Sequence, residues 1–243
     1  MTPQASDRTG SGRGRRRAAL TALLGACILL FAALGVWQMQ RRGEKLALIE
    51  AVGERLRRPP MPAPGPAEWP RISFGSDGYR RLRVRGAFLH DREILVQAST
   101  RLGPGYWVMT PLRTDGGWLV LVNRGFVPPE HRDRAGRRAD EPRGEVTLTG
   151  LLRLSEPGGS FLHANDPAGN RWYSRDVATI GRARRLTPLA PYFIDAAPGR
   201  DEPGQPVGGL TVVSFANNHL QYALTWFALA GLAAFGLARV RRT

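Results

Sequence analysis

The sequence has few of the residues that usually carry catalytic or metal chemistry. Its 243 residues include a single cysteine, Cys27, which excludes an internal disulfide and a C-x-x-C thiol pair. The four histidines lie far apart in the chain, and this spacing disfavours a dedicated zinc or copper site. A phosphate-binding loop, a G-x-G-x-x-G between a strand and a helix, H-E-x-x-H and G-x-S-x-G are all absent. We therefore expect neither catalytic residues nor a dedicated metal site.

Acidic residues are also scarce relative to basic ones. The chain has 20 Asp and Glu against 35 Lys and Arg, which gives a net charge of +15. The excess is spread along the chain and forms no single block, so we expect no nucleic-acid partner. Anionic lipid headgroups or an acidic protein partner fit this distribution better. The mean hydropathy of −0.27 is typical of a soluble protein, but this average conceals two apolar runs at the ends.

Charged residues are missing from two long runs, one near each end of the chain. Residues 18–37 form a run of 20 and residues 222–238 a run of 17. A helix of the first length covers about 30 Å, the thickness of the hydrocarbon core of a bilayer. A cleaved signal peptide could also explain the first run, but its length and poor cleavage pattern favour a retained anchor. A buried core helix could explain the second run, but the arginines that close it, at 239, 241 and 242, favour a membrane span.

These runs divide the chain into segments. Arginines lie outside both runs, so the positive-inside rule places both termini in the cytoplasm and the long loop on the other side of the membrane. The predicted segments are a cytoplasmic basic tail (1–17), a first transmembrane helix (18–37), an amphipathic helical stalk (38–57), a proline-rich linker (58–70), an extracytoplasmic β-rich domain (71–216), a second transmembrane helix (217–238) and a second cytoplasmic basic tail (239–243).

The long loop has the pattern of an all-β domain. Short alternating or β-branched stretches predict strands at residues 79–88, 92–97, 106–112, 118–127, 145–154, 191–194 and 210–215. Thr114–Gly117 has the composition of a hairpin turn, and residues 177–185 are the best candidate for a helix. We therefore predict a membrane protein in which two transmembrane helices flank a mostly antiparallel β barrel or sandwich with one short helix.

Two side chains are candidates for binding a cofactor. His219 stands where the second apolar run begins, and an imidazole there could be an axial ligand to a haem iron in an apolar slot. An interfacial histidine that bonds a headgroup or a helix end would occupy the same position. Arg124 follows an apolar stretch and could pair with a carboxylate such as a haem propionate, or form a salt bridge within the domain. Gly125 is predicted to supply a bulge or a positive φ, and Trp172 is either a partner contact or a core residue.

Many short blocks of the sequence match one known family in the family's own order. The matching blocks are Leu34–Gln38, Arg41–Arg42, Tyr79–Arg80, Val84–Gly86, Phe88, Val108–Leu112, Leu121–Pro128, Gly144–Val146, Gly150, Arg153, Asn165, Asn170–Asp176, Pro191–Ala196, Gly208–Gly209, Asn218–Tyr222 and Thr225–Trp226. Through these blocks the chain from about Leu34 to Trp226 resembles the surfeit locus protein one (Surf/Shy) family of cytochrome oxidase assembly factors.

The resemblance implies a non-enzymatic function in the biogenesis of haem–copper terminal oxidases. It implies that the protein works on subunit I, with haem a synthase as a further partner, and that it binds haem a transiently with His219 as a ligand. A tail as short as residues 1–17 favours a bacterial inner membrane over a mitochondrial presequence. Two alternatives stay open. The protein could be a scaffold that stabilises an assembly intermediate without haem, or a membrane-anchored envelope enzyme.

Overall fold

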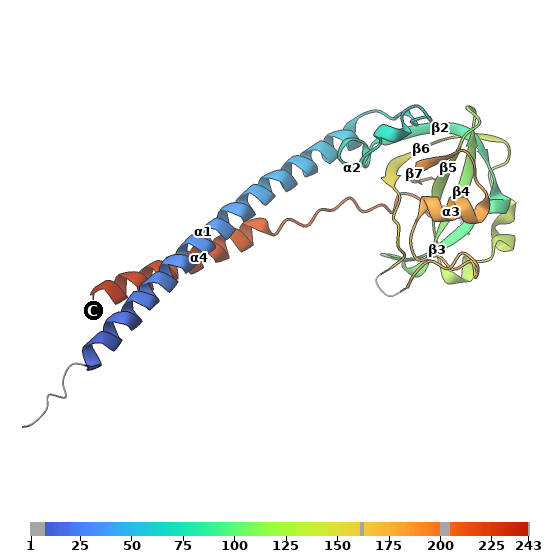
Figure 1. Ribbon diagram of the computed structural model, residues 1–243. Coiled ribbons are helices and arrows are strands. Elements are labelled where there is room, and N and C mark those ends of the chain that lie inside the picture. The colour runs from blue at the N-terminus through green and yellow to red at the C-terminus, as the bar shows by residue number, and fades with distance from the viewer. Residues whose placement is uncertain (1–7, 161–162, 200–204, 243) are drawn as a thin grey trace, which may run out of the picture. The chain divides into compact units, whose positions relative to one another are not determined.

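The computed structural model describes residues 8–160, 163–199 and 205–242, and the chain divides into two units (Figure 1). The first unit, here called the helical unit, comprises the chain up to Glu50 together with the chain from Ser214 onward. The second, the barrel unit, comprises Ala51–Val213. The apolar runs and the alternating stretches of the sequence thus fold into separate units.

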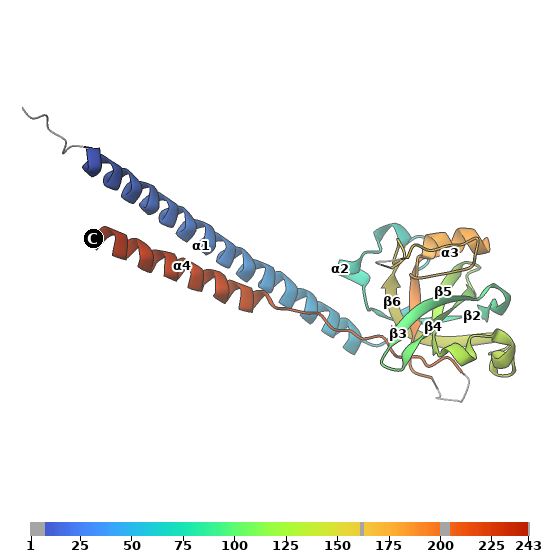
Figure 2. The same cartoon turned by 90° about the horizontal axis from the view of Figure 1, so that it is seen from below.

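The helical unit consists of two helices that lie side by side. Helix α1 (Arg8–Arg57) and helix α4 (His219–Arg242) run in opposite directions, as two views show (Figure 1 and Figure 2). The rings of Phe31 and Trp226 stack between them with centroids 5.7 Å apart. At the other end of the pair, Nη2 of Arg17 donates to the backbone oxygen of Val240 over 3.0 Å. This last contact places the first turns of α1 beside the last turn of α4.

Both helices are long and apolar enough to cross a membrane. In the most apolar stretch of each helix only 6% of the residues are buried within the protein, although the helices contact each other. Leu29 and Leu232 are 74% and 67% exposed. A core helix of a soluble protein would bury such side chains, so the exposed apolar surface favours a lipid environment. The predicted stalk at 38–57 is the uninterrupted continuation of α1 and no separate element.

The barrel unit is built on one sheet of seven strands. They are β1 (Met61–Pro62), β2 (Arg81–Phe88), β3 (Ile94–Thr100), β4 (Gly103–Thr114), β5 (Leu119–Val127), β6 (Glu145–Leu154) and β7 (Leu189–Ala196). Their order is β1-β2-β6-β7-β5-β4-β3, and a further pairing of β2 with β4 closes the sheet into a barrel. Gly86 lies at this closure, where a Cβ would stand 2.1 Å from the backbone oxygen of Arg113.

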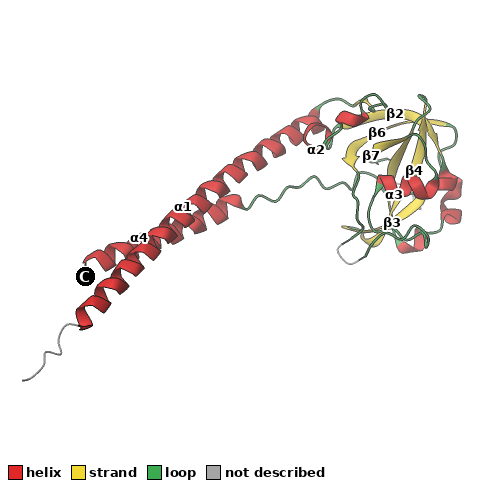
Figure 3. Cartoon of the chain, in the orientation of Figure 1, coloured by secondary structure: helices red, strands yellow, loops and turns green. Residues whose placement is uncertain are grey.

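Most neighbouring strands are antiparallel, as predicted, but β5 pairs with β7, and the short β1 with β2, in parallel. The short helices lie outside the sheet (Figure 3). They are α2 (Phe74–Asp77) and α3 (Val177–Arg184), together with the 3₁₀ turns Trp69–Arg71, His90–Arg92, Pro129–His131 and Arg134–Asp140. Helix α3 begins where predicted, because the Asp176 carboxylate accepts from the backbone N–H of Thr179 over 3.1 Å.

Two apolar clusters stabilise the barrel unit. One cluster draws side chains from all the strands that form the ring and fills its interior, as in Leu82, Leu152 and Tyr192. The other lies between α3 and the opposite faces of β5 and β7, and it contains Ile180 and Trp172. Trp172 is 1% exposed, so it is a core residue, and its side chain is not available to contact a partner protein. Both faces of β5 are therefore buried, which explains its nearly continuous apolar sequence.

One strand prediction was wrong. Residues 210–215 contain the apolar and β-branched alternation of a strand, yet they lie in an irregular segment, 208–218, between the barrel and α4. Only Val207, just before this segment, forms an isolated bridge, to Phe126. The physical reason is that a strand needs a backbone partner, and the described strand ladders include none of these residues; Thr211 contacts the barrel through its side chain, which donates to Asp195.

Candidate functional site

His219, the predicted ligand, is the first residue of α4 and is half-buried. Its Nδ1–H donates to Oε1 of Gln38 on α1 over 2.8 Å. Backbone bonding of the helix starts at the same point, because the N–H of Tyr222 donates to the oxygen of Asn218 over 3.2 Å. Within the described residues, no hydrogen bond engages Nε2 of His219. The ring is thus anchored through one nitrogen, and the other nitrogen is available to a ligand.

Two aromatic residues near Gln38 and His219 in the sequence are only partly covered. Trp37 precedes Gln38 and is 50% exposed, while Tyr222, one turn after His219, is 55% exposed. Two residues before His219, Oδ1 of Asn217 is buried and has no hydrogen-bond partner among the described residues.

Arg124, the second predicted residue, lies on β5 in the barrel unit, so it and His219 belong to different units. Its side chain is 9% exposed, and its Nη1 lies 3.6 Å from Oε2 of Glu93. The guanidinium also stands over the Phe88 ring, 5.5 Å from its centroid. Burial lowers the pKa of Arg124, and the charge of Glu93 partly offsets this effect. The salt bridge within the domain therefore exists, while the pairing with a propionate stays a prediction.

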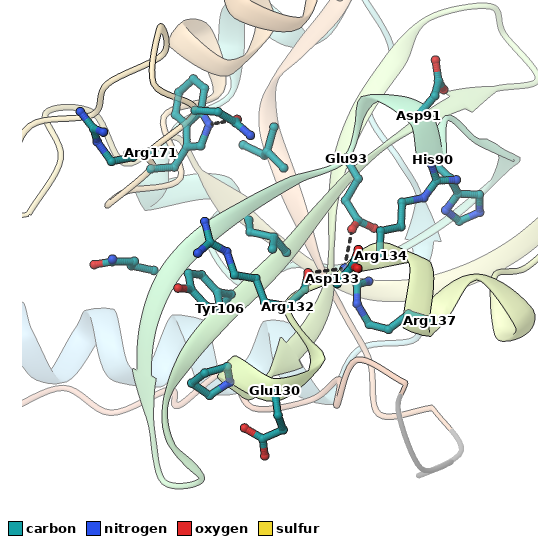
Figure 4. A pocket seen from close by; sticks show the side chains of 16 residues that line it. His90, Asp91, Glu93, Tyr106, Glu130, Arg132, Asp133, Arg134, Arg137 and Arg171 are labelled. Carbon is teal, nitrogen blue, oxygen red and sulfur yellow. Dashed lines mark hydrogen bonds and ion pairs between the residues drawn. The ribbon is translucent and has the colours of Figure 1, made fainter.

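Arg124 belongs to a larger buried charge cluster. Glu93 also accepts from Nη2 of Arg137 over 2.8 Å, and Glu141 accepts two hydrogen bonds from Arg134, over 2.6 and 2.9 Å. The bond from Arg134 lowers the pKa of Glu141. The cluster borders a cavity of about 640 Å³ that is lined by charged side chains of both signs (Figure 4).

The same cluster contains a trio that resembles a metal site. Ligand atoms of His90, Glu93 and Glu141 all lie within 4.8 Å of one another. However, both carboxylates already pair with guanidinium groups, and three arginines face two carboxylates. A divalent cation would add charge to a site that is already net positive, so the geometry disfavours metal binding there.

Sequence reasoning missed a second buried cluster, which is centred on Asp195 of β7. This carboxylate is 3% exposed and accepts hydrogen bonds from four side chains. The donors are Asn123 at 2.8 Å, Arg153 at 2.8 Å, Arg175 at 3.2 Å and Thr211 at 2.8 Å. The two guanidinium groups also lie over the Phe193 ring. Thr211 belongs to the segment that leads toward α4, and its bond to Asp195 holds this part of the segment against the barrel.

The signal for this cluster was present only in the matching blocks. Asn123, Arg153, Arg175 and Asp195 each lie in or form a different block, and no spacing connects them. Gly125, in the block with Asn123, has the predicted positive φ, at +140°. A Cβ at this position would stand 2.4 Å from the backbone carbon of Val207, so the close approach of this segment to β5 requires glycine.

Comparison with known proteins agrees with the fold and with these blocks. A sequence profile of the SURF1 family matches residues 25–231. Surfeit locus protein 1 of Homo sapiens is 36% identical over 220 residues, which cover 83% of this chain and 71% of the human protein. The Mus musculus protein of that name is 36% identical over 219 residues, 83% of this chain and 69% of its own. A SURF1-like protein of Monosiga brevicollis is 35% identical over 225 residues, 87% and 83% of the two chains. The two apolar helices, the barrel between them and these matches show that the chain belongs to the SURF1 family of cytochrome oxidase assembly factors.

Proposed function

We propose that the protein binds haem a transiently in the membrane and assists its insertion into subunit I of a haem–copper oxidase. The single observation that carries this proposal is His219, whose ring is anchored through Nδ1 while Nε2 is free of hydrogen bonds within the described residues. Family membership supports the assembly role, and the imidazole supports the cofactor. When bound, haem a supplies the redox-active iron that the oxidase requires.

The residues at the start of α4 fit such a group. Imidazole is a usual axial ligand of haem iron, and the exposed rings of Trp37 and Tyr222 offer apolar surface for a porphyrin. His219 would hold the haem through Nε2, the nitrogen that Gln38 leaves free. A single protein ligand keeps release feasible, because transfer then needs only tighter binding by the acceptor and no energy source.

We further propose that the protein resides in a bacterial inner membrane, with both termini in the cytoplasm and the barrel unit outside. The contact between Arg17 and Val240 supports a common side for the two ends. Three arginines, at 239, 241 and 242, close α4, and Arg15–Arg17 lie near the start of α1. Such arginine-rich ends are retained in the cytoplasm by the positive-inside rule. Haem a synthase is the partner that would supply the cofactor.

The test is haem binding by the His219→Ala variant. The wild type, purified in detergent from cells that make haem a, should show a haem absorption band, and His219→Ala should lose it. His131→Ala is the matched control, since His131 is exposed on the barrel unit and should keep the band. A His219→Ala protein that keeps the band with unchanged affinity would refute the ligand assignment.

A second measurement separates haem delivery from a haem-free scaffold. Oxidase subunit I should be captured by the wild type, and oxidase activity should fall in cells that carry only His219→Ala. Capture that survives the substitution together with near-normal oxidase activity would instead support the scaffold.

A further inference from the structure

We infer that Gln38 is a positioning residue for His219, because its amide oxygen holds the Nδ1 proton and thereby leaves Nε2 unprotonated as the ligand atom. This inference rests on the proposed function. The two side chains come from different helices of the helical unit and are separated by 181 positions in the chain, yet they meet over 2.8 Å. Both are half-buried.

The chemistry follows from the two atoms that meet. A neutral imidazole carries one N–H, and its other nitrogen has a lone pair. The carbonyl oxygen of an amide only accepts hydrogen bonds, so a close contact between Oε1 and Nδ1 requires the proton to be on Nδ1. The lone pair then lies on Nε2, the nitrogen that binds metal. Histidines that bind metals usually donate their other N–H to a fixed acceptor in this way.

The surroundings strengthen this single contact. At the boundary of an apolar helix pair, water competes less for the Nδ1–H than it does at an exposed surface. Gln38 sits on α1 one turn from Gly35, where a Cβ would stand 2.5 Å from the Phe227 ring of α4. This close packing fixes the distance between the helices next to the Gln38–His219 pair, so the acceptor is held in place before a ligand arrives.

The inference predicts different effects for two substitutions of Gln38. Gln38→Leu keeps much of the side-chain volume but removes the acceptor, so haem affinity should fall about 10–100-fold, as is usual when such a partner is lost. Gln38→Glu offers a stronger acceptor, which raises the electron density of the imidazole. It should therefore retain haem and lower the reduction midpoint potential of the bound iron relative to the wild type.

The experiment uses the full chain in detergent, titrated with ferric haem b as the probe and followed by absorption, with spectroelectrochemistry of the bound haem. Gln40→Leu is the matched control: Gln40 is exposed two residues further along α1 and should leave both affinity and potential unchanged. Circular dichroism of each variant checks that the helices still form.

The outcomes distinguish the two proposals. In one outcome haem binding depends on His219, but both Gln38 variants keep the affinity and potential of the wild type. This outcome would overturn the role of Gln38 and leave the proposed function standing. Haem binding that does not change in His219→Ala would refute the ligand assignment on which both proposals rest, and no haem binding by the wild type would overturn the proposed function itself. A helix contact without influence on the ligand would leave the potential of Gln38→Glu equal to that of the wild type, and this result also counts against the inference.

Discussion

Removal of the Asp195 carboxylate should destabilise the barrel more than any surface substitution. The side chain is 3% exposed, and the two guanidinium groups that bond it, those of Arg153 and Arg175, are 17% and 13% exposed. In Asp195→Ala the one acidic partner that both cations keep among the described residues is Glu156, which is 38% exposed. Removing one partner of a buried ion pair costs about 3–5 kcal/mol, because the remaining charge is left uncompensated.

This cost converts to a measurable shift in thermal unfolding. For a chain of this length, 1 kcal/mol corresponds to about 2–4 °C, so the midpoint should fall by roughly 6–20 °C. Four of the six tryptophans lie in the barrel unit, so near-ultraviolet circular dichroism of the full chain in detergent reports chiefly on that unit. Asp91→Ala is the control, since its side chain is 74% exposed and the change should cost no more than about 0.5 kcal/mol. An Asp195→Ala midpoint as close to the wild type as that of Asp91→Ala would refute the reasoning.

Two further predictions concern the barrel. Gly125→Ala places a methyl group at a residue whose φ is +140° and pushes it against Val207, so this change should lower the thermal unfolding midpoint. Gly117→Ala is the control: φ is +80° there, but no atom lies within 4 Å of the added Cβ, so its midpoint should fall less. Equal shifts in the two variants would contradict the prediction. Glu141 has a lowered pKa because Arg134 bonds it, so its contribution to stability is complete above the ordinary value of 4.5 and is lost as pH falls through the lower folded pKa. The free energy of unfolding should therefore fall less for Glu141→Gln than for the wild type when the pH is lowered from neutral to about pH 3. Urea unfolding at each pH measures this difference, and an equal fall in both proteins would count against the pairing of Glu141 with Arg134.

Local patterns in the sequence predicted most of the elements. The strand at 145–154 has the observed bounds of β6, and the hairpin turn at Thr114–Gly117 joins β4 to β5. Alternation specifies a strand where one face is buried and the other is wet, as in β2, β3 and β6, whereas β5 is recognised by its continuous apolar run. The helix at Val177 was predictable because Asp176 supplies a cap whose chemistry depends only on nearby residues.

Features that depend on distant partners could not be predicted. Residues 210–215 have the pattern of a strand, but whether a strand forms depends on a distant backbone partner, and the described strand ladders include none of these residues. The Asp195 cluster joins residues from β5, β6, β7 and two loops, so no spacing in the sequence marks it. The same is true of Gln38: the sequence placed it in a matching block, but only the fold shows that it meets His219.

The order of the chain has a consequence for biogenesis. Helix α1 is synthesised first and helix α4 last, and all of the barrel unit lies between them. The barrel contains every strand that closes its ring, and domains usually fold as units while synthesis proceeds. The barrel can therefore finish folding before the second helix has emerged, and the bond between Gln38 and His219 must be among the last native contacts to form. A nascent chain would therefore lack the Gln38–His219 pair until α4 has emerged, and the cofactor binding that we propose would begin only after that step.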